Sequence, residues 1–175
     1  DGDGWIDVSR PLSPGTPVWP GDRPLELSQV NTDDLLVTAF STTCQVGTHI
    51  DAPLHLSPGG VAVHEIPLGR LIGPAEVVRL PNGCSAATPE DMPLGWTPIH
   101  PKLLFTTDSQ AVAVPLTDGV AGLSADLGHW LAVRGVVTLG IDTPSVDVFS
   151  PADLEAHHAL VERAFGRLPP GFHDL

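Results

Sequence analysis

Glycine and proline punctuate this chain so densely that short elements joined by turns are expected along most of its length. There are 18 Gly and 19 Pro, together 37 of the 175 residues. Because both residue types favour turns and interrupt helices, the pattern favours a β-rich fold over a helix bundle. The apolar fraction of 42% allows a real core, and with no Tyr and only five Phe that core should be mostly aliphatic.

Strands are expected where β-branched and other apolar residues gather in short runs between turn residues. These runs cover residues 35–44, 76–80, 102–107 and 136–141. The alternating residues 5–9 read as an edge strand, which leads into a Pro-rich loop with a turn at 18–22.

Two helices are expected in the second half of the chain. The first spans residues 124–134, with Ser124 at its start and Gly135 as its stop. The second begins with Ser150 as a cap and Pro151 at the first helical position. Strands first and helices late predict an α/β class with mixed α and β structure, in a single domain over residues 1–175.

Charge and cysteine content exclude several classes of protein. The formal net charge is −13 with only eight Lys plus Arg, so no basic face for nucleic acid is expected. Cys44 and Cys84 are too few and too far apart for a disulfide scaffold or a zinc finger, although one disulfide stays open. With no signal pattern and no apolar run of about 18 residues, the expected location is cytoplasmic, without a membrane partner.

The segment from Gln45 to His55 carries the strongest chemical signal. In an extended chain alternate residues share a face, so His49 and Asp51 are expected to point the same way and could bind one metal ion. Gln45 lies on the same face of an extended chain, but it needs a bend at Gly47 to come close enough to His49 to share a metal ion. Asp51 could instead cap a turn, and His55 could be an ordinary loop residue.

A second candidate lies on the late helix. Helical spacing places Leu154, His157, Val161 and Ala164 on one face, so His157 is expected to point inward. A buried His bonded to a backbone carbonyl is the alternative. Three polar residues follow the strand expected at 136–141, namely Asp142, Ser145 and Asp147. They could accept hydrogen bonds from His ligands and orient them, or they could stabilise the turn around Pro144 instead.

The segment Gln45-Val-Gly-Thr-His-Ile-Asp-Ala-Pro-Leu-His55 resembles the motif His-x-Gly-Thr-His-x-Asp-x-Pro-x-His of the cyclase family, which includes bacterial kynurenine formamidases and related metal-dependent hydrolases. Every fixed position matches except the first. The resemblance continues through most of the chain, in the family's order, at residues 17–22, 66–68, 140–147 and 156–160.

The resemblance implies a role for each matching residue. His49 and Asp51 would be metal ligands, His157 would bind a second ion, and His55 would be the catalytic acid/base. Trp19 would line the substrate pocket. The implied fold is the swivelling β/β/α type, a mixed sheet curling toward a barrel with a few outer helices. The implied assembly is a homo-oligomer, a dimer or tetramer, for which the Pro-rich N-terminal arm would suit swapping.

Two departures from the family pattern affect the metal site. Gln45 replaces the family's first histidine, and an amide oxygen is a harder and weaker ligand than imidazole. The resemblance implies zinc, in one or two copies, and the amide oxygen of Gln45 leaves manganese or magnesium as alternatives. The family's glutamate after the His-His helix is also missing near residues 167–168, and the family's last strands would follow residue 175. Either these segments are lost or the sequence omits them.

The implied reaction is the hydrolysis of a C–N amide bond in a small molecule, an aryl formamide such as N-formylkynurenine. The metal would lower the pKa of its water and polarise the carbonyl. His55 would take a proton from the water and return it to the leaving amine. The alternatives are a hydrolase of the same fold that acts on a lactone, a cyclic imide or an isatin-like ring, and a degenerate, non-catalytic binding protein.

Overall fold

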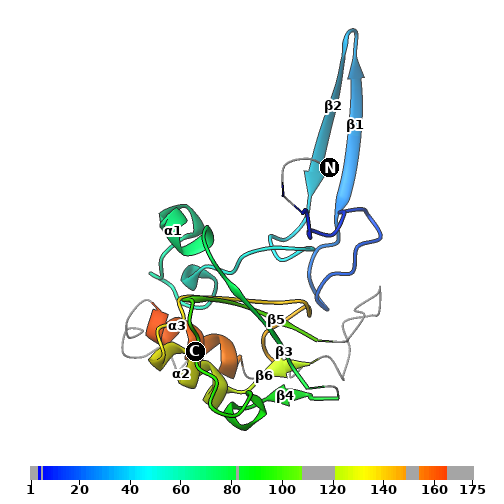
Figure 1. Ribbon diagram of the computed structural model, residues 1–175. Coiled ribbons are helices and arrows are strands. Elements are labelled where there is room, and N and C mark those ends of the chain that lie inside the picture. Colours follow the sequence, from blue (N-terminus) through cyan, green and yellow to red (C-terminus); the bar gives the residue numbers. More distant parts are fainter. Residues whose placement is uncertain (1–3, 5, 82, 108–120, 149–153, 165–175) are drawn as a thin grey trace. The chain divides into compact units, whose positions relative to one another are not determined.

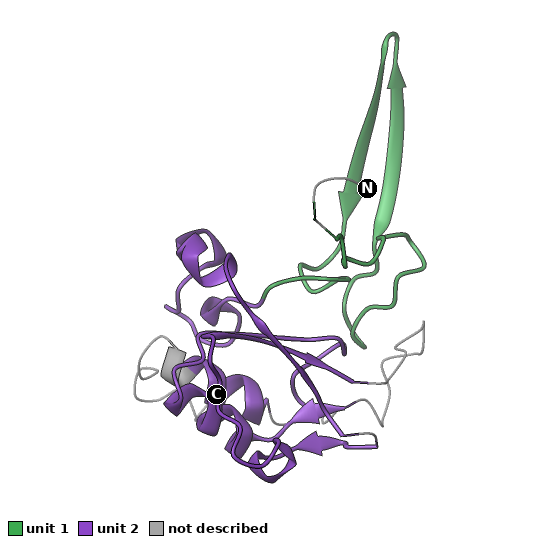
Figure 2. Ribbon diagram, in the orientation of Figure 1, with its two compact units in different colours: residues 1–50, 113–116 green, residues 51–112, 117–175 purple. Residues whose placement is uncertain are grey.

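The computed structural model describes residues 4, 6–81, 83–107, 121–148 and 154–164 (Figure 1). The chain divides into two compact units (Figure 2). Unit 1 comprises residues 1–50 and 113–116, and unit 2 comprises residues 51–112 and 117–175. The expectation of a single domain stays a prediction.

Unit 1 is dominated by a two-stranded antiparallel ribbon, formed by β1 (Glu26–Thr32) and β2 (Leu35–Ser41). The strand expected at 35–44 is therefore present, and it ends at Ser41. The two strands are joined at Asp33 and Asp34, where Asp33 adopts a positive φ of 31°. Asp tolerates this left-handed region better than most residues, because its short side chain can bond to the local backbone.

The loop before the ribbon contains the expected turn at 18–22. Trp19 accepts a backbone hydrogen bond from Asp22 at 2.9 Å, and Gly21 adopts φ +95°. Pro at the second position and Gly with positive φ at the third are the signature of a type II turn. The expected edge strand at 5–9 is wrong for residues 6–9, which form no strand. There the Ser9 amide bonds to the Asp7 carboxylate, which favours a local turn over pairing with a strand.

Unit 2 is built on a parallel sheet of three strands in the order β3-β5-β7. These strands are β3 (Glu76–Arg79), β5 (Lys102–Thr106) and β7 (Thr138–Ile141), so all three expected runs form strands. Helix α2 (Ala125–Val133) precedes β7, and Ser124 caps it by accepting a hydrogen bond from the Leu127 amide. Gly135, with φ +85°, follows its end. The expected start and stop of this helix are both confirmed.

The core of unit 2 lies between the sheet and the helices α2 and α3 (Glu155–Ala164), which lie on the same side of it (Figure 1). Alternate residues of the strands contribute one face to it, while Val77 and Leu104 on the other face are exposed. The core is aliphatic, as expected, with Phe105 and Met92 as its larger exceptions. Its buried members are Val78, Leu80, Ala87, Met92, Leu103, Phe105, Leu123, Leu127, Leu131, Val136 and Ala156.

Helix α3 (Glu155–Ala164) packs against α2 through small residues. Ala156 and Ala159 are buried, and a Cβ on Gly128 of α2 would lie 3.0 Å from the Ala159 Cβ. The expected inward face is therefore wrong in part, because Leu154 is exposed and precedes the helix. The helix begins four residues later than Pro151, which lies with Ser150 outside the described residues.

The remaining elements are short. A second parallel pair is formed by β4 (Ala86–Ala87) and β6 (Gly122–Leu123), and Leu123 also bridges to Asp147. The other short elements are η1 (Pro53–His55), η2 (Val63–Glu65), α1 (Leu68–Leu71) and η3 (Pro89–Asp91).

The α/β class is confirmed by this mixture of parallel and antiparallel strands with a few helices. In the part of the chain that the structure describes, the strands form three small sheets of two, three and two strands. The curl of one mixed sheet toward a barrel therefore stays a prediction. Within the described ranges, none of the helices has the length and apolarity needed to cross a bilayer.

Gly122 offers a test of how tightly unit 2 is packed. A Cβ at this position would lie 2.5 Å from the Val148 nitrogen and 2.6 Å from the Asp147 carbonyl carbon. Because backbone atoms must move, we expect Gly122→Ala to destabilise the protein by about 1–3 kcal/mol. The matched control is Gly69→Ala in α1, where nothing lies within 4 Å and alanine favours the helix. Urea unfolding measures both, and equal stabilities of the two variants would contradict the close packing at Gly122.

Candidate active site

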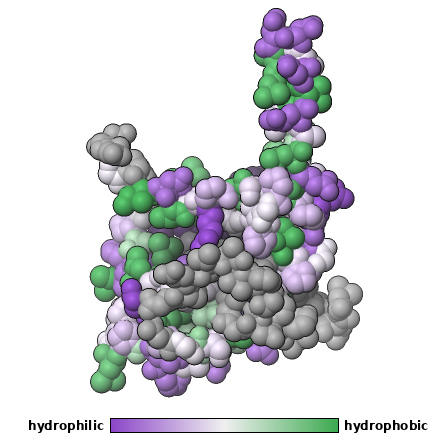
Figure 3. Space-filling model, turned by 90° about the vertical axis from the view of Figure 1, so that its right-hand side faces the viewer, coloured by the Kyte–Doolittle hydropathy of each residue, from purple (hydrophilic) through white to green (hydrophobic). Residues whose placement is uncertain are grey.

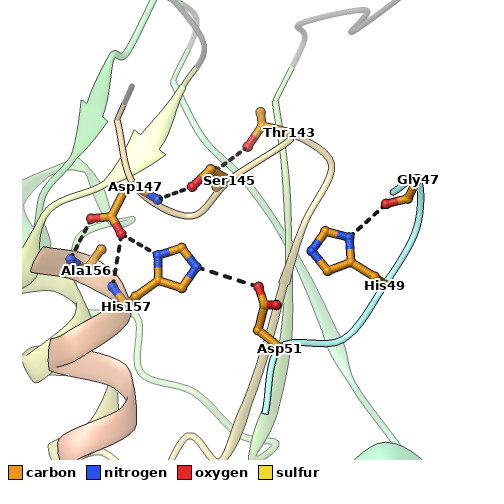
Figure 4. A network of polar contacts seen from close by, with 8 residues as sticks. All are labelled: Gly47, His49, Asp51, Thr143, Ser145, Asp147, Ala156 and His157. Atoms are coloured by element: carbon orange, nitrogen blue, oxygen red, sulfur yellow. Dashed lines mark hydrogen bonds and ion pairs between the residues drawn. The ribbon is translucent and has the colours of Figure 1, made fainter. Parts of the chain in front are cut away.

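The Asp147 carboxylate connects a loop to the first turn of α3 and to His157. Its Oδ1 accepts a hydrogen bond from the Ala156 amide at 2.7 Å, and its Oδ2 accepts one from the His157 amide at 3.2 Å. The same Oδ2 contacts Nδ1 of the His157 ring (Figure 4). A carboxylate at a helix N-terminus satisfies amides that have no partner within the helix and faces the positive end of its dipole. Asp147 therefore fixes the start of α3 and the orientation of the His157 ring together.

His157 lies between two carboxylates, with Asp147 at Nδ1 and Asp51 at Nε2 (Figure 4). Its side chain is only 13% exposed. Burial by itself lowers the pKa of His157, but hydrogen bonds and charges from Asp147 and Asp51 outweigh it and raise that pKa to about 9. At neutral pH and without a metal, His157 is therefore protonated and neutralises part of the acidic charge around it.

The pair formed by His157 and Asp51 also fits a divalent cation. Nε2 of His157 and Oδ2 of Asp51 are 3.7 Å apart. Two ligands that each bind zinc at about 2.1 Å in tetrahedral geometry lie roughly 3.4 Å apart, so a small rearrangement would suffice. The Nδ1 contact with Asp147 is the carboxylate–imidazole arrangement that holds metal-binding histidines in place. Among the described residues, no group of three or more His, Cys, Asp or Glu side chains is already gathered around a metal position.

The segment carrying His49 belongs to unit 1 and is not a strand. Residues 44–48 form a turn and a bend, so Gln45 and His49 do not lie on one continuous strand. Gly47 has φ +68°, and a Cβ there would lie 2.3 Å from Cδ2 of Leu12. Both observations explain the motif glycine, because any other residue would be strained and would collide with Leu12. The expected bend at Gly47 is confirmed.

His49 is oriented by the bend itself. Its Nδ1 lies 2.8 Å from the Gly47 carbonyl oxygen, which can only accept a hydrogen bond (Figure 4). Nδ1 therefore donates this hydrogen bond, and in the neutral ring Nε2 is the nitrogen with the lone pair that a metal ligand needs. His49 and His157 thus share one property, since in both rings a main-chain or carboxylate oxygen binds Nδ1.

His55 is the last residue of η1, which Pro53 starts. The turn is closed by backbone hydrogen bonds from Leu54 to Val61 and from Ser57 to Pro53. Gly60 lies directly against it, and a Cβ there would be 2.6 Å from the Pro53 carbonyl carbon. The side chain of His55 is exposed, so it is accessible to a substrate.

The other two predicted site residues, Gln45 and Trp19, both lie in unit 1. Both are half-buried. The turn that carries Trp19 is joined to Thr43, which donates a hydrogen bond from Oγ1 to Asp22 Oδ2 at 3.1 Å. The structure therefore connects the Trp19 turn to the residues that lead into the motif.

Two of the polar residues after β7 are structural. Asp142 accepts hydrogen bonds from the hydroxyls of Thr106 and Thr107 and from the Thr107 amide, so it joins the ends of β5 and β7. Ser145 accepts a hydrogen bond from the Asp147 amide at 3.1 Å, which is turn chemistry. Only Asp147 takes the predicted role of orienting a histidine. Its second role, capping α3, was not predicted, because an acid eight residues before the helix gives no local capping signal.

Comparisons with known proteins match one family and several of its members over most of this chain. The family described as "Putative cyclase" matches residues 6–148. Kynurenine formamidase from Salinibacter ruber is 35% identical over 97% of this chain and 87% of its own length. That alignment spans 184 positions, which exceeds the chain's 175 residues, so the relative carries residues without a counterpart here. Kynurenine formamidases from Bordetella petrii and Bacillus mycoides are 33% and 32% identical over 90% and 89% of the chain and 77% and 76% of their own lengths.

Solved structures share the fold. A predicted metal-dependent hydrolase from Bacillus stearothermophilus superposes with a TM-score of 0.71 at 24% identity, over 92% of this chain and 78% of the other. An isatin hydrolase bound to a product analogue gives a TM-score of 0.67 at 15% identity, over 92% and 77%. The motif from Gln45 to His55, the family match and the relatives over most of both lengths agree, and the chain belongs to the cyclase family.

Proposed function

We propose that this chain is an amidohydrolase that uses a divalent metal to cleave the C–N bond of an aryl formamide such as N-formylkynurenine. The products are formate and an aryl amine. Support comes from the relatives named kynurenine formamidase, which are 32–35% identical over 89–97% of the chain. The finer fold that we propose with it is the swivelling β/β/α type, whose sheet curls toward a barrel.

The observation that carries the proposal is the arrangement of Asp147, His157 and Asp51. A nearly buried imidazole is held at Nδ1 by one carboxylate and faces a second carboxylate at 3.7 Å with Nε2. A purely structural histidine needs only one of these partners. Two carboxylates around one ring make a site of negative charge that a divalent cation would neutralise.

We assign the metal to His157 and Asp51, with His49 and Gln45 as further ligands on the strength of the motif. Zinc suits two imidazoles and a carboxylate, while the amide oxygen of Gln45 leaves manganese or magnesium as alternatives. When bound, such a cation polarises a carbonyl and makes a water molecule more acidic.

The chain's own residues supply binding and proton transfer. His55, exposed at the end of η1, takes a proton from the attacking water and later gives it to the leaving amine. The turn closed by backbone hydrogen bonds holds the backbone of His55 in place during both steps. Trp19 packs on the aryl ring of the substrate, which a half-buried indole can do with its exposed face.

The proposed activity is tested with purified protein and a panel of substrates. We expect hydrolysis of N-formylkynurenine that is abolished by a chelator and restored by zinc or manganese. Lactones, a cyclic imide and isatin serve as competitors in the same panel. Preference for one of these rings would replace the proposed substrate, and a lack of both turnover and bound metal would favour a binding protein.

His55→Ala tests the assignment of the acid/base. We expect kcat to fall by about 10²–10⁴-fold, because proton transfer loses its positioned group, while metal content stays the same. His64→Ala is the matched control, since His64 is an exposed histidine in the short helix η2. Loss of metal in His55→Ala would show that His55 is a ligand instead.

Asp147→Asn tests the orientation of His157. The amide oxygen of Asn can still accept a hydrogen bond from α3. The substitution removes the negative charge beside Nδ1 of His157, and it favours the tautomer with the proton on Nε2, which cannot bind a metal there. We expect metal affinity to fall by about 10–100-fold, the pKa of His157 in metal-free protein to fall, and helix content to stay the same. Metal titration, NMR and circular dichroism measure these effects, with Asp126→Asn in α2 as the control. Unchanged metal affinity would contradict the role of Asp147.

A further inference from the structure

Three consecutive hydroxyl side chains fasten the loop before the ribbon to the segment that enters the motif. They are Ser41, Thr42 and Thr43, and their partners are Asp22 and Arg23. Thr43 Oγ1 donates a hydrogen bond to Asp22 Oδ2 at 3.1 Å. Thr42 Oγ1 donates one to the Arg23 carbonyl oxygen at 3.3 Å, and Ser41 Oγ accepts one from Arg23 Nη1 at 2.8 Å. We call these three contacts the hydroxyl clasp.

The same loop, residues 10–23, is held to the motif at its other end. The Arg10 amide donates a hydrogen bond to Thr48 Oγ1 at 3.2 Å. The Leu12 side chain lies directly against Gly47, where an added Cβ would be 2.3 Å from Leu12 Cδ2. Figure 1 shows the loop at the base of the ribbon, in dark blue. Both of its ends are therefore attached to the segment that contains the motif.

Between these attachments the loop has little freedom. Four of the 14 residues from 10 to 23 are Pro, each of which fixes its own φ. Ser13 and Thr16 close one turn, with a hydrogen bond from the Thr16 amide to the Ser13 carbonyl at 2.8 Å and one from the Ser13 amide to Thr16 Oγ1 at 2.9 Å. The turn of Trp19 is closed by the Asp22 amide at 2.9 Å. Trp19 therefore lies in a turn whose last residue is held by the clasp.

The contact between Thr43 and Asp22 is the least exposed part of the clasp. It is partly buried, whereas the contacts of Ser41 and Thr42 lie at the surface. A hydroxyl that donates to a carboxylate away from water makes a stronger hydrogen bond than one that competes with solvent. This contact also acts on the residue that closes the Trp19 turn. The Thr43 hydroxyl is therefore the group that most restricts movement of Trp19 relative to the motif segment.

We propose that Thr43 is a positioning residue for substrate specificity, which acts through Asp22 to hold Trp19 where its indole stacks on the planar ring of an aryl formamide. This inference rests on the proposed function and adds a reason for the choice of a planar substrate. An indole that is already fixed loses little conformational entropy when a flat ring stacks on it. Thr43 touches no substrate atom in this role, so its hydroxyl affects KM for aryl substrates and not the chemical step.

The first test observes Trp19 directly and needs no substrate. In the full chain labelled with fluorotryptophan, Trp19→Phe assigns the fluorine NMR resonance of Trp19 among the four Trp residues. We expect this resonance to shift or broaden in Thr43→Val, which removes the hydroxyl at nearly constant volume. Thr43→Ser restores the hydrogen bond and should restore the resonance.

Thr38→Val is the matched control, because the Thr38 hydroxyl also binds a side chain of unit 1 but lies outside the clasp. It accepts a hydrogen bond from Gln29 Nε2 at 3.2 Å within the ribbon. The ribbon already carries hydrophobic residues along its surface (Figure 3), so one more methyl group is tolerated there. The Trp19 resonance should not change in this variant.

The second test compares N-formylkynurenine with an alkyl formamide of similar size. Thr43→Val should raise KM for the aryl substrate by about five- to tenfold, the effect of one lost hydrogen bond, with kcat within about twofold. KM for the alkyl substrate should stay within about twofold, as should both values in Thr43→Ser and Thr38→Val. In a Trp19→Ala background, Thr43→Val should raise KM no further, because the two residues act as one unit.

The two tests separate this inference from the proposed function. An unchanged Trp19 resonance in Thr43→Val would overturn the inference and leave the proposed function intact. So would an equal rise of KM for both substrates, or a fall in kcat at constant KM. If the wild-type protein hydrolyses neither formamide, the proposed function fails and the role in specificity fails with it, while the resonance still decides whether Thr43 positions Trp19. If Thr43→Val does not fold, Asp22→Asn weakens the same contact and should raise KM for the aryl substrate by about two- to threefold.

Discussion

The contact between the Asp147 carboxylate and the first turn of α3 is the constraint on which the site in unit 2 depends. One oxygen binds the Ala156 amide, and the other binds the amide and the ring of His157. The position of Asp147 is itself set by Leu123, whose amide donates to the Val146 carbonyl at 2.6 Å. The Asp147 side chain therefore connects the core strand that contains Leu123 to the imidazole that faces Asp51. Stability and chemistry are coupled at this point, because the group that starts the helix also orients the ring.

The elements predicted correctly are those whose signals are local. Ser124 and Gly135 mark the two ends of α2, and the runs at 76–80 and 102–107 are short and apolar between turn residues. The Pro20-Gly21 turn follows from the conformations that these two residues prefer. In each case the residues that determine the structure lie within a few positions of it.

The errors arise where a distant or competing contact decides. Residues 6–9 alternate like a strand, but the Asp7 carboxylate binds the Ser9 amide within the same segment. The start of α3 is fixed by Asp147, which lies eight residues before it, and so a search for a cap directly beside the helix fails. Spacing and the family resemblance together pointed to the residues of the candidate site, but neither could give their local conformation.

The turn that holds His55 determines which neighbouring residues can be substituted. Its shape is set by main-chain bonds and by the close approach of Gly60, so it does not depend on the side chain of Leu54, which is 48% exposed. Leu54 and the exposed Pro58 can therefore be replaced without displacing the backbone of His55. Under the proposed role of His55, substitutions at these two positions change the surface beside the acid/base while its backbone stays in place.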